Sequence, residues 1–174
     1  LDALNQRVLL FDGAMGTNLD RQHLTAEHFG GEKTVGCNDC LVLTYPQAVE
    51  IVHRSFLETG ADVIETDSFR SNRLTLAEYG MNERVYEVNH AAASLARRLA
   101  DEYSTPGKPR FVAGSIGPSG KLISAEDQQM SDISFDDLAD LFREQAIGLI
   151  EGGVDLLLIE TSQDILEVKA VVYG

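Results

Sequence analysis

Residues 154–162 read VDLLLIETS, an apolar run that breaks abruptly into a glutamate, a threonine and a serine. The same break occurs three more times, in LLFDGA at 9–14, VIETDSF at 63–69 and FVAGSIGP at 111–118. A helix-like stretch follows each break, an alternation typical of strands and helices that build a parallel sheet. All strands of such a sheet end on one face, where ligands bind. The four breaks therefore predict a small-molecule site at that face.

This pattern predicts four strands, over Val8–Phe11, Asp62–Thr66, Arg110–Ala113 and Val154–Ile159. It predicts helices over 46–58, 74–79, 85–103, 134–151 and 164–172, and a long polar connection over 17–45. Thr44 is expected to cap the first of these helices, and Gly60 to end it. Ser134 is expected to cap the fourth helix, and Gly152-Gly153 to end it.

Four strand–helix units fit two architectures. A doubly wound open sheet normally carries a glycine-rich phosphate loop after its first strand, but residues 13–16, GAMG, do not match G-x-G-x-x-G. A (β/α)8 TIM barrel takes about 250 residues. We therefore expect the α/β class, with residues 1–174 forming the first four βα units of a truncated barrel. Leu1 in place of Met, and an end directly after a helix, suggest a piece of a longer polypeptide.

The composition excludes several classes of partner. The chain has 28 acidic and 14 basic residues and a net charge of −14, which repels nucleic acid and anionic membrane surfaces. Its longest apolar runs are far shorter than the roughly 20 residues of a membrane span. No signal-peptide pattern opens the chain, and two cysteines do not make a disulfide framework. We expect a cytoplasmic protein.

Two strand ends carry the candidate binding residues. Asp12-Gly13-Ala14 follows the first strand, where the aspartate can accept hydrogen bonds and the glycine lets a carboxylate approach backbone N–H groups. Alternatively, Asp12 only caps the following turn. Glu160 ends an apolar strand, where a buried carboxylate needs a partner. That partner is a ligand ammonium or a neighbouring Arg or Lys.

Two other segments carry further candidates. Glu65 and Asp67 alternate with Ile64 and Thr66 along the second strand, so either the first two or the second two side chains point into the lumen of the expected barrel. Ser68-Phe69 then offers a hydroxyl and an aromatic ring at the end of this strand. Residues 114–120, GSIGPSG, are expected to form a loop with three glycines. Such a loop is either a backbone nest for an anion or a tight turn that needs the glycines.

Cys37-Asn38-Asp39-Cys40 is a C-x-x-C motif, which can be half of a zinc site or a redox pair. No second C-x-x-C occurs, and the motif lies in a connection rather than at a helix N-terminus after a strand. His23 and His28 lie nearby without zinc-finger spacing. Zinc or redox work by this pair is therefore the less favoured interpretation.

Five segments in order resemble the homocysteine S-methyltransferase family: FDGAMGT at 11–17, Asn38-Asp39, GADVIET at 60–66, GSIGP at 114–118 and GVDLLLIET at 153–161. The likeness covers essentially all 174 residues. It implies a (β/α)8 barrel that binds homocysteine at its C-terminal face and transfers a methyl group to its sulfur, forming methionine.

The implied substrate-binding residues, carried over by position, are Asp12, Gly13, Ala14, Ser68, Phe69 and Glu160. The two carboxylates would hold the amino group, and the backbone at the glycine and alanine, with the serine nearby, would receive the carboxylate. The phenylalanine would shape the pocket. Asp67 stands where many family members have an asparagine, and its added negative charge would alter how the pocket holds the substrate.

In this family a zinc ion on three cysteines holds the homocysteine sulfur as a thiolate, because coordination removes the thiol proton. In cobalamin-dependent members the methyl group comes from methylcobalamin, and folate- and cobalamin-binding domains follow the barrel. The family's zinc cysteines would lie beyond Gly174, and Cys37 and Cys40 do not match their positions. We therefore expect no catalytic or metal-ligating residue within 1–174, and no activity from these residues alone.

Two alternatives stay open. Four βα units leave two exposed strand edges, which invite pairing with another copy and would make the chain a folding or assembly unit. Betaine- and S-methylmethionine-dependent relatives use the same barrel, so the methyl donor is not determined by these residues.

Overall fold

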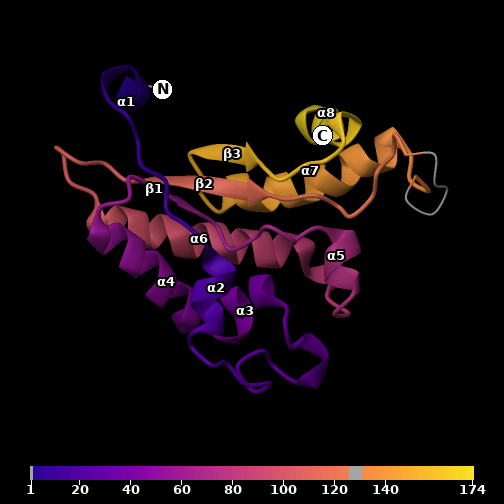
Figure 1. The fold of residues 1–174 in the computed structure, drawn as a ribbon, viewed down its shortest axis with the longest axis horizontal. Helices are drawn as coiled ribbons and strands as arrows, with labels where there is room; N and C mark the ends of the chain where they lie inside the picture. The colour runs from indigo at the N-terminus through magenta and orange to yellow at the C-terminus, as the bar shows by residue number, and fades with distance from the viewer. Residues whose placement is uncertain (1, 126–130) are drawn as a thin grey trace.

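A computed structural model describes residues 2–125 and 131–174 of the chain. In this described part, three parallel strands form one sheet in the order β1 (Val63–Glu65), β2 (Phe111–Ile116) and β3 (Leu156–Ile159). Val63 pairs with Phe111 across the first ladder, and Ala113 with Leu156 across the second. Helices connect the strands and return the chain to the same end of the sheet (Figure 1). The alternation of strands and helices is thereby confirmed.

Helical segments make up most of the remaining structure. They are α1 (Asp2–Gln6), α2 (Met15–Asp20), η1 (Glu32–Thr34), η2 (Asn38–Cys40), α3 (Leu41–Thr44), α4 (Pro46–Thr59), α5 (Arg73–Ala77), η3 (Asn82–Arg84), α6 (Val85–Tyr103), α7 (Phe135–Glu151) and α8 (Ile165–Tyr173), where η marks a 3-10 turn. The expected polar connection over 17–45 thus contains short helices that the sequence pattern did not predict.

The ends of the long helices follow local chemistry. Gly60 ends α4 with a left-handed φ of 108°, a conformation that glycine adopts without a Cβ clash. The Ser134 side chain caps α7 by accepting a hydrogen bond from the Asp137 N–H at 3.1 Å. The expected cap at Thr44 is wrong, because this residue ends α3 and its hydroxyl donates back to the Cys40 carbonyl at 3.2 Å.

One of three buried core clusters lies between the sheet and the helices on one of its faces. Ile64 of β1 and Val112 of β2 are fully buried against Leu57 of α4 and Leu99 of α6. Figure 1 shows α6 running along the sheet, with α4 beyond it. Because neighbouring side chains of a strand point to opposite faces, Glu65 and Ser115 lie on the side away from these helices. The sheet therefore positions polar groups opposite its core.

The expected first strand, Val8–Phe11, does not form as a strand. Phe11 makes a single parallel bridge with Val63, and the Val63 N–H donates to the Leu10 carbonyl at 3.0 Å. The Leu10 N–H donates to Asp62 Oδ2 at 3.0 Å. A side chain therefore takes the place of the backbone carbonyl that a strand ladder would offer to this N–H. This segment nevertheless carries the chain alongside β1 and delivers Asp12 to the end of the sheet.

Both edges of the sheet are apolar and open. Val8 is 81% and Leu10 60% exposed on one edge, and Leu156 is 39% and Leu157 37% exposed on the other. No helix in the described part of the chain is long and apolar enough to span a membrane.

Candidate functional site

A cleft of about 520 Å³ opens at the ends of the strands. It is lined by Asp12, Gly13, Ala14, Met15, Gly16, Gly36, Asn38, Asp39, Glu65, Thr66, Asp67, Phe69, Arg70, Tyr79, Ser115 and Glu160. Five of the six residues predicted to bind substrate are among them, and Ser68 is the exception. The structure therefore brings the ends of separate strands together around one cavity, and their roles there remain proposals.

Three of the lining carboxylates form what we call the strand-end cluster: Asp12, Glu65 and Glu160. The Asp12 carboxylate accepts the Glu65 N–H at 3.1 Å from Oδ2 and 3.2 Å from Oδ1. The Glu160 side chain is within hydrogen-bonding reach of the Glu65 side chain. Ser115 of β2 donates from Oγ to Glu160 Oε1 at 2.5 Å. Segments separated by more than a hundred residues thus converge on one acidic group.

Two carboxylates of the cluster, those of Asp12 and Glu65, have raised pKa values. Burial raises the pKa of Asp12 to about 7, and the charges of Glu65 and Glu160 add to the effect. Burial, followed by the charge of Glu160, raises the pKa of Glu65 to about 7. A positive charge among them would favour their ionised forms. The cluster therefore suits a cationic group such as a ligand ammonium.

Ser68 has a structural place rather than a position on the cleft surface. It is fully buried, and its Oγ donates to the Ser115 carbonyl at 2.8 Å and lies 2.6 Å from Thr66 Oγ1. The Gln145 side chain of α7 donates to the Ser68 carbonyl at 2.8 Å. The chain turns after β1 and directs this side chain inward, and the expected place of Ser68 near the substrate carboxylate stays a prediction.

Asp39 and Asp67, which we call the acid pair, form another part of the lining. Asp39 Oδ1 accepts the Arg70 N–H at 2.9 Å and the Ser71 hydroxyl at 3.0 Å. Burial raises the pKa of Asp67 well above its ordinary value, and the charge of Asp39 adds to it. The expected effect of an added negative charge at this position stays a prediction.

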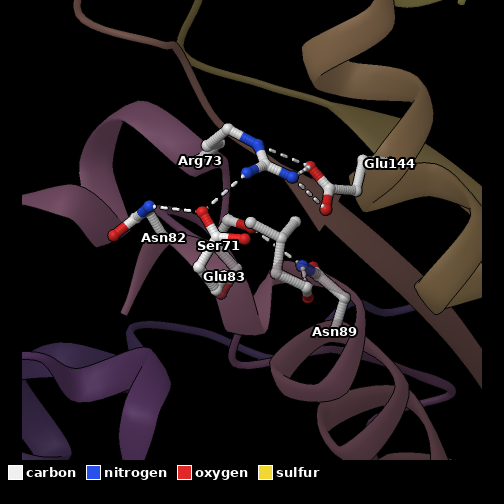
Figure 2. Close-up of polar contacts among 7 residues, drawn as sticks. Ser71, Arg73, Asn82, Glu83, Asn89 and Glu144 are labelled. Atoms are coloured by element: carbon white, nitrogen blue, oxygen red, sulfur yellow. Dashed lines mark hydrogen bonds and ion pairs between the residues drawn. The ribbon is translucent and has the colours of Figure 1, made fainter. Parts of the chain in front are cut away.

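The acid pair rests on a polar network between α5, α6 and α7, drawn in Figure 2. Asn89 of α6 donates to the Ser71 carbonyl at 2.8 Å (Figure 2). The Ser71 hydroxyl in turn donates to Asp39 Oδ1 at 3.0 Å. Arg73 binds both oxygens of Glu144, at 2.7 and 2.9 Å from Nη2. These contacts fix the segment that follows Phe69, and with it the acid pair.

Two glycines are required by close packing around the cleft. A Cβ at Gly117 would lie 2.5 Å from the Phe69 carbonyl oxygen, which also accepts the Gly117 N–H at 3.0 Å. A Cβ at Gly13 would lie 3.2 Å from the Phe56 ring of α4. Gly117 thus holds Phe69 against the cleft. The expected loop over 114–120 is wrong in its first half, because 114–116 belong to β2.

The C-x-x-C motif does not form a metal centre in this structure. Cys37 and Cys40 are joined by a disulfide and are both buried, so neither thiolate is available. Within residues 2–125 and 131–174, no group of three or more His, Cys, Asp or Glu side chains is placed to hold a metal ion. The described residues therefore do not fit the zinc site that the family resemblance implies.

Sequence reasoning did not assign Asp39, Arg70, Tyr79 or Ser115 to the cleft. Arg70 is the cation among the described lining residues, and its Nη2 pairs with Glu78 Oε1 at 2.9 Å. The sequence signal for Asp39 was its place in one of the five family-like segments. No periodic pattern marks the others, because long-range contacts bring them to the site.

Comparisons with known proteins agree with this geometry. The profile of the homocysteine S-methyltransferase family matches residues 9–173. Methionine synthases of Mycobacterium tuberculosis and Mycobacterium leprae are 40% and 39% identical over all 174 residues, which span 14% of the length of either relative.

Solved structures show the same fold. The metallated form of the homocysteine methyltransferase MmuM from Escherichia coli superposes with a TM-score of 0.78 at 22% identity, over 98% of this chain and 59% of that one. Its apo form gives a TM-score of 0.69 over 97% of this chain and 55% of that one. The match over 9–173, together with an acidic cleft at the strand ends, shows that the chain belongs to the homocysteine S-methyltransferase family.

Proposed function

We propose that the cleft binds homocysteine by its amino-acid end, in a protein whose whole length transfers a methyl group to the homocysteine sulfur. The observation that carries this proposal is the strand-end cluster, in which Asp12 and Glu65 have pKa values raised to about 7. A ligand ammonium would relieve the mutual repulsion of these carboxylates. The match to the homocysteine S-methyltransferase family supports homocysteine as the amino acid.

We assign the binding roles as follows. Asp12 and Glu160 accept hydrogen bonds from the ammonium, and Glu65 adds negative charge beside them. The backbone at Gly13 and Ala14, which lines the cleft, receives the carboxylate. The Phe69 ring shapes the pocket for the remaining chain of the substrate. Ser68 supports this arrangement from behind, through its bond to the Ser115 carbonyl.

Sulfur activation is assigned to residues outside this chain. Zinc supplies a thiolate in the family, and the described residues do not fit a zinc site. We propose that the zinc cysteines, and the domains that bind folate and methylcobalamin, belong to a longer protein. Identity of 40% to a methionine synthase supports methylcobalamin over betaine or S-methylmethionine as the methyl donor. These residues then bind and orient homocysteine without catalysing its methylation.

The architecture fits the same proposal. Three parallel strands and the bridge at Phe11 follow the order of the first units of a (β/α)8 barrel. The likeness to MmuM, which covers 59% of that chain, supports a half barrel that further residues close.

Isothermal titration of L-homocysteine under anaerobic conditions tests the binding role. We expect one ligand per chain in the full-length protein. A methyl-transfer assay on the 174 residues alone, with zinc added, is expected to give no turnover. Absence of binding by the full-length protein would contradict the proposal, and substantial turnover by the 174 residues would contradict the division of roles.

The open edges favour a second candidate, self-association. Val8 and Leu10 on one edge and Leu156 and Leu157 on the other expose apolar surface that a second copy could cover by parallel strand pairing. Two copies related by a two-fold axis would then close a ring from their two three-stranded sheets and the two segments bridged at Phe11. Sedimentation of the 174-residue chain is expected to show a dimer. A stable monomer would contradict this candidate.

A further inference from the structure

Asp67 differs from the other described residues of the cleft because one of its buried carboxyl oxygens has no hydrogen-bond partner. Its side chain is buried, with 6% of the residue exposed, and Oδ2 has no hydrogen-bond partner. Among the described residues that line the cleft, no other has a fully buried side-chain oxygen left unpaired. Leaving such an oxygen unpaired costs about 1–3 kcal/mol. An unpaired group at a ligand cleft indicates a group that the ligand satisfies.

The surroundings of Asp67 decide which kind of ligand group fits. The charged and titratable residues around it in the cleft are Asp12, Asp39, Glu65, Arg70, Tyr79 and Glu160. Asp39 is the neighbour whose charge acts on Asp67 directly. Arg70 is engaged by Glu78 at 2.9 and 3.0 Å. Burial, followed by the charge of Asp39, raises the pKa of Asp67 and shifts it towards its protonated form, in which the carboxyl is a hydrogen-bond donor.

A protonated carboxyl needs an acceptor, and the ligand supplies one. The ammonium end of an amino acid belongs at the strand-end cluster, where three carboxylates meet. The carboxylate end then needs donors elsewhere in the cleft. The Ser68 hydroxyl does not serve, because its proton is already donated to the Ser115 carbonyl. Asp67 is the adjacent residue with a free oxygen.

We propose that Asp67 is a specificity-determining residue that donates a hydrogen bond from Oδ2 to the α-carboxylate of the amino acid held in the cleft. This inference rests on the proposed function, because it assumes an amino acid with its ammonium at the strand-end cluster. It assigns the acid pair to recognising the anionic end of the ligand. The cleft then distinguishes an amino acid from a simple amine.

The test compares two ligands and two substitutions in the full-length protein. The ligands are L-homocysteine and 3-aminopropane-1-thiol, which lacks only the carboxylate, and both are titrated anaerobically at pH 7. Asp67→Asn keeps a donor of similar shape, and Asp67→Ala removes it. Asp136→Asn, on the exposed first turn of α7, serves as the matched control. Thermal unfolding reports whether each variant folds.

We expect Asp67→Ala to weaken L-homocysteine binding by about tenfold to a hundredfold, the range for hydrogen bonds to charged groups. The same variant should bind 3-aminopropane-1-thiol within about threefold of the wild type, because that ligand has no carboxylate to lose. Asp67→Asn should bind L-homocysteine within about threefold of the wild type. Removing an unpaired buried carboxyl should leave the thermal midpoint of Asp67→Ala unchanged or raise it.

Equal losses for both ligands in Asp67→Ala would show a structural role and overturn the inference. A loss in Asp67→Asn as large as that in Asp67→Ala would show an ionised acceptor for the ammonium, which also overturns it. No binding of L-homocysteine by the wild type would overturn the proposed function, and this inference with it. Wild-type binding with an unaffected Asp67→Ala would overturn this inference alone.

Discussion

The strand-end cluster and the acid pair both place carboxylates in one cleft, but they hold them differently. In the strand-end cluster, the Asp12 carboxylate accepts the Glu65 N–H and the Glu160 carboxylate accepts the Ser115 hydroxyl, and the pKa values of Asp12 and Glu65 are raised to about 7. In the acid pair, Asp67 has an unpaired oxygen and a pKa raised well above its ordinary value. A site for an ammonium needs ionised acceptors, whereas a site for a carboxylate needs donors. In our proposal, carboxyl groups in two different environments therefore bind the two ends of one amino acid.

Removing charge from the strand-end cluster should have the largest effect. Glu160→Gln keeps the shape of the side chain and the contact with Ser115 but removes an anionic acceptor. We expect L-homocysteine binding by the full-length protein to weaken by about a hundredfold, from the loss of a charge-assisted hydrogen bond of up to about 3 kcal/mol. Titration calorimetry measures it, with Asp136→Asn as control. Unchanged affinity would separate Glu160 from the ammonium site.

The pH dependence of stability tests the same cluster without ligand. The folded pKa of Asp12, about 7, is above its ordinary value of 3.8, so the native state keeps a proton that the unfolded chain releases. The free energy of unfolding therefore falls as pH rises from about 4 to about 7. We expect the free energy of unfolding to fall by about 2 kcal/mol between pH 5 and pH 7, because a shift of one pKa unit corresponds to about 1.4 kcal/mol.

Urea unfolding of the full-length protein and of Asp12→Asn across pH 5 to 7.5 measures this slope. The variant should show a flatter profile than the wild type, because it lacks the titrating carboxyl. Asp62 does not confuse the comparison, since its contact with Arg7 lowers its pKa to about 2, below this window. Parallel profiles for the two proteins would show that Asp12 ionises normally.

These predictions rest on a cleft that the sequence revealed only in part. Asp12 and Glu160 were identified because each directly follows an apolar strand, where chain direction alone places a side chain at the sheet end. The burial of the Ser68 side chain could not be predicted, because β1 has already ended and strand alternation no longer describes the turn. Asp39 was missed because its position depends on the Arg70 N–H and the Ser71 hydroxyl, about thirty residues away in the chain.

For the fold, too, features set by local sequence could be predicted and features set by long-range contacts could not. Helices α4, α6 and α7 were predicted because apolar spacing, a capping Ser134 and a terminating Gly60 are local signals. The strand over Val8–Phe11 was predicted from its apolar run. Its pairing stops at one bridge because Asp62 takes the Leu10 N–H, a contact that no local pattern encodes.

Removing a hydrogen bond behind the acid pair should have a smaller effect than changing the strand-end cluster. Asn89→Ala removes the donor to the Ser71 carbonyl, which is part of the buried network in Figure 2. We expect a loss of about 1.5 kcal/mol in the free energy of unfolding, within the range for an unmade buried hydrogen bond. Urea unfolding measures it. A loss below about 0.5 kcal/mol would show that Ser71 is held without Asn89.

The ion pair in the same network should have the smallest effect. Arg73 is 43% and Glu144 29% exposed at the side chain, so water already competes for the charges that join them at 2.7 Å. We expect Arg73→Gln to cost less than about 1 kcal/mol of stability, and less still at high salt. Urea unfolding of Arg73→Gln and of Asn89→Ala, each in low and in high salt, compares an exposed and a buried contact of the same network. A larger cost for Arg73→Gln would mean that the network behind the acid pair depends on the Arg73–Glu144 ion pair. The acid pair would then be held in place by an interaction that high salt weakens.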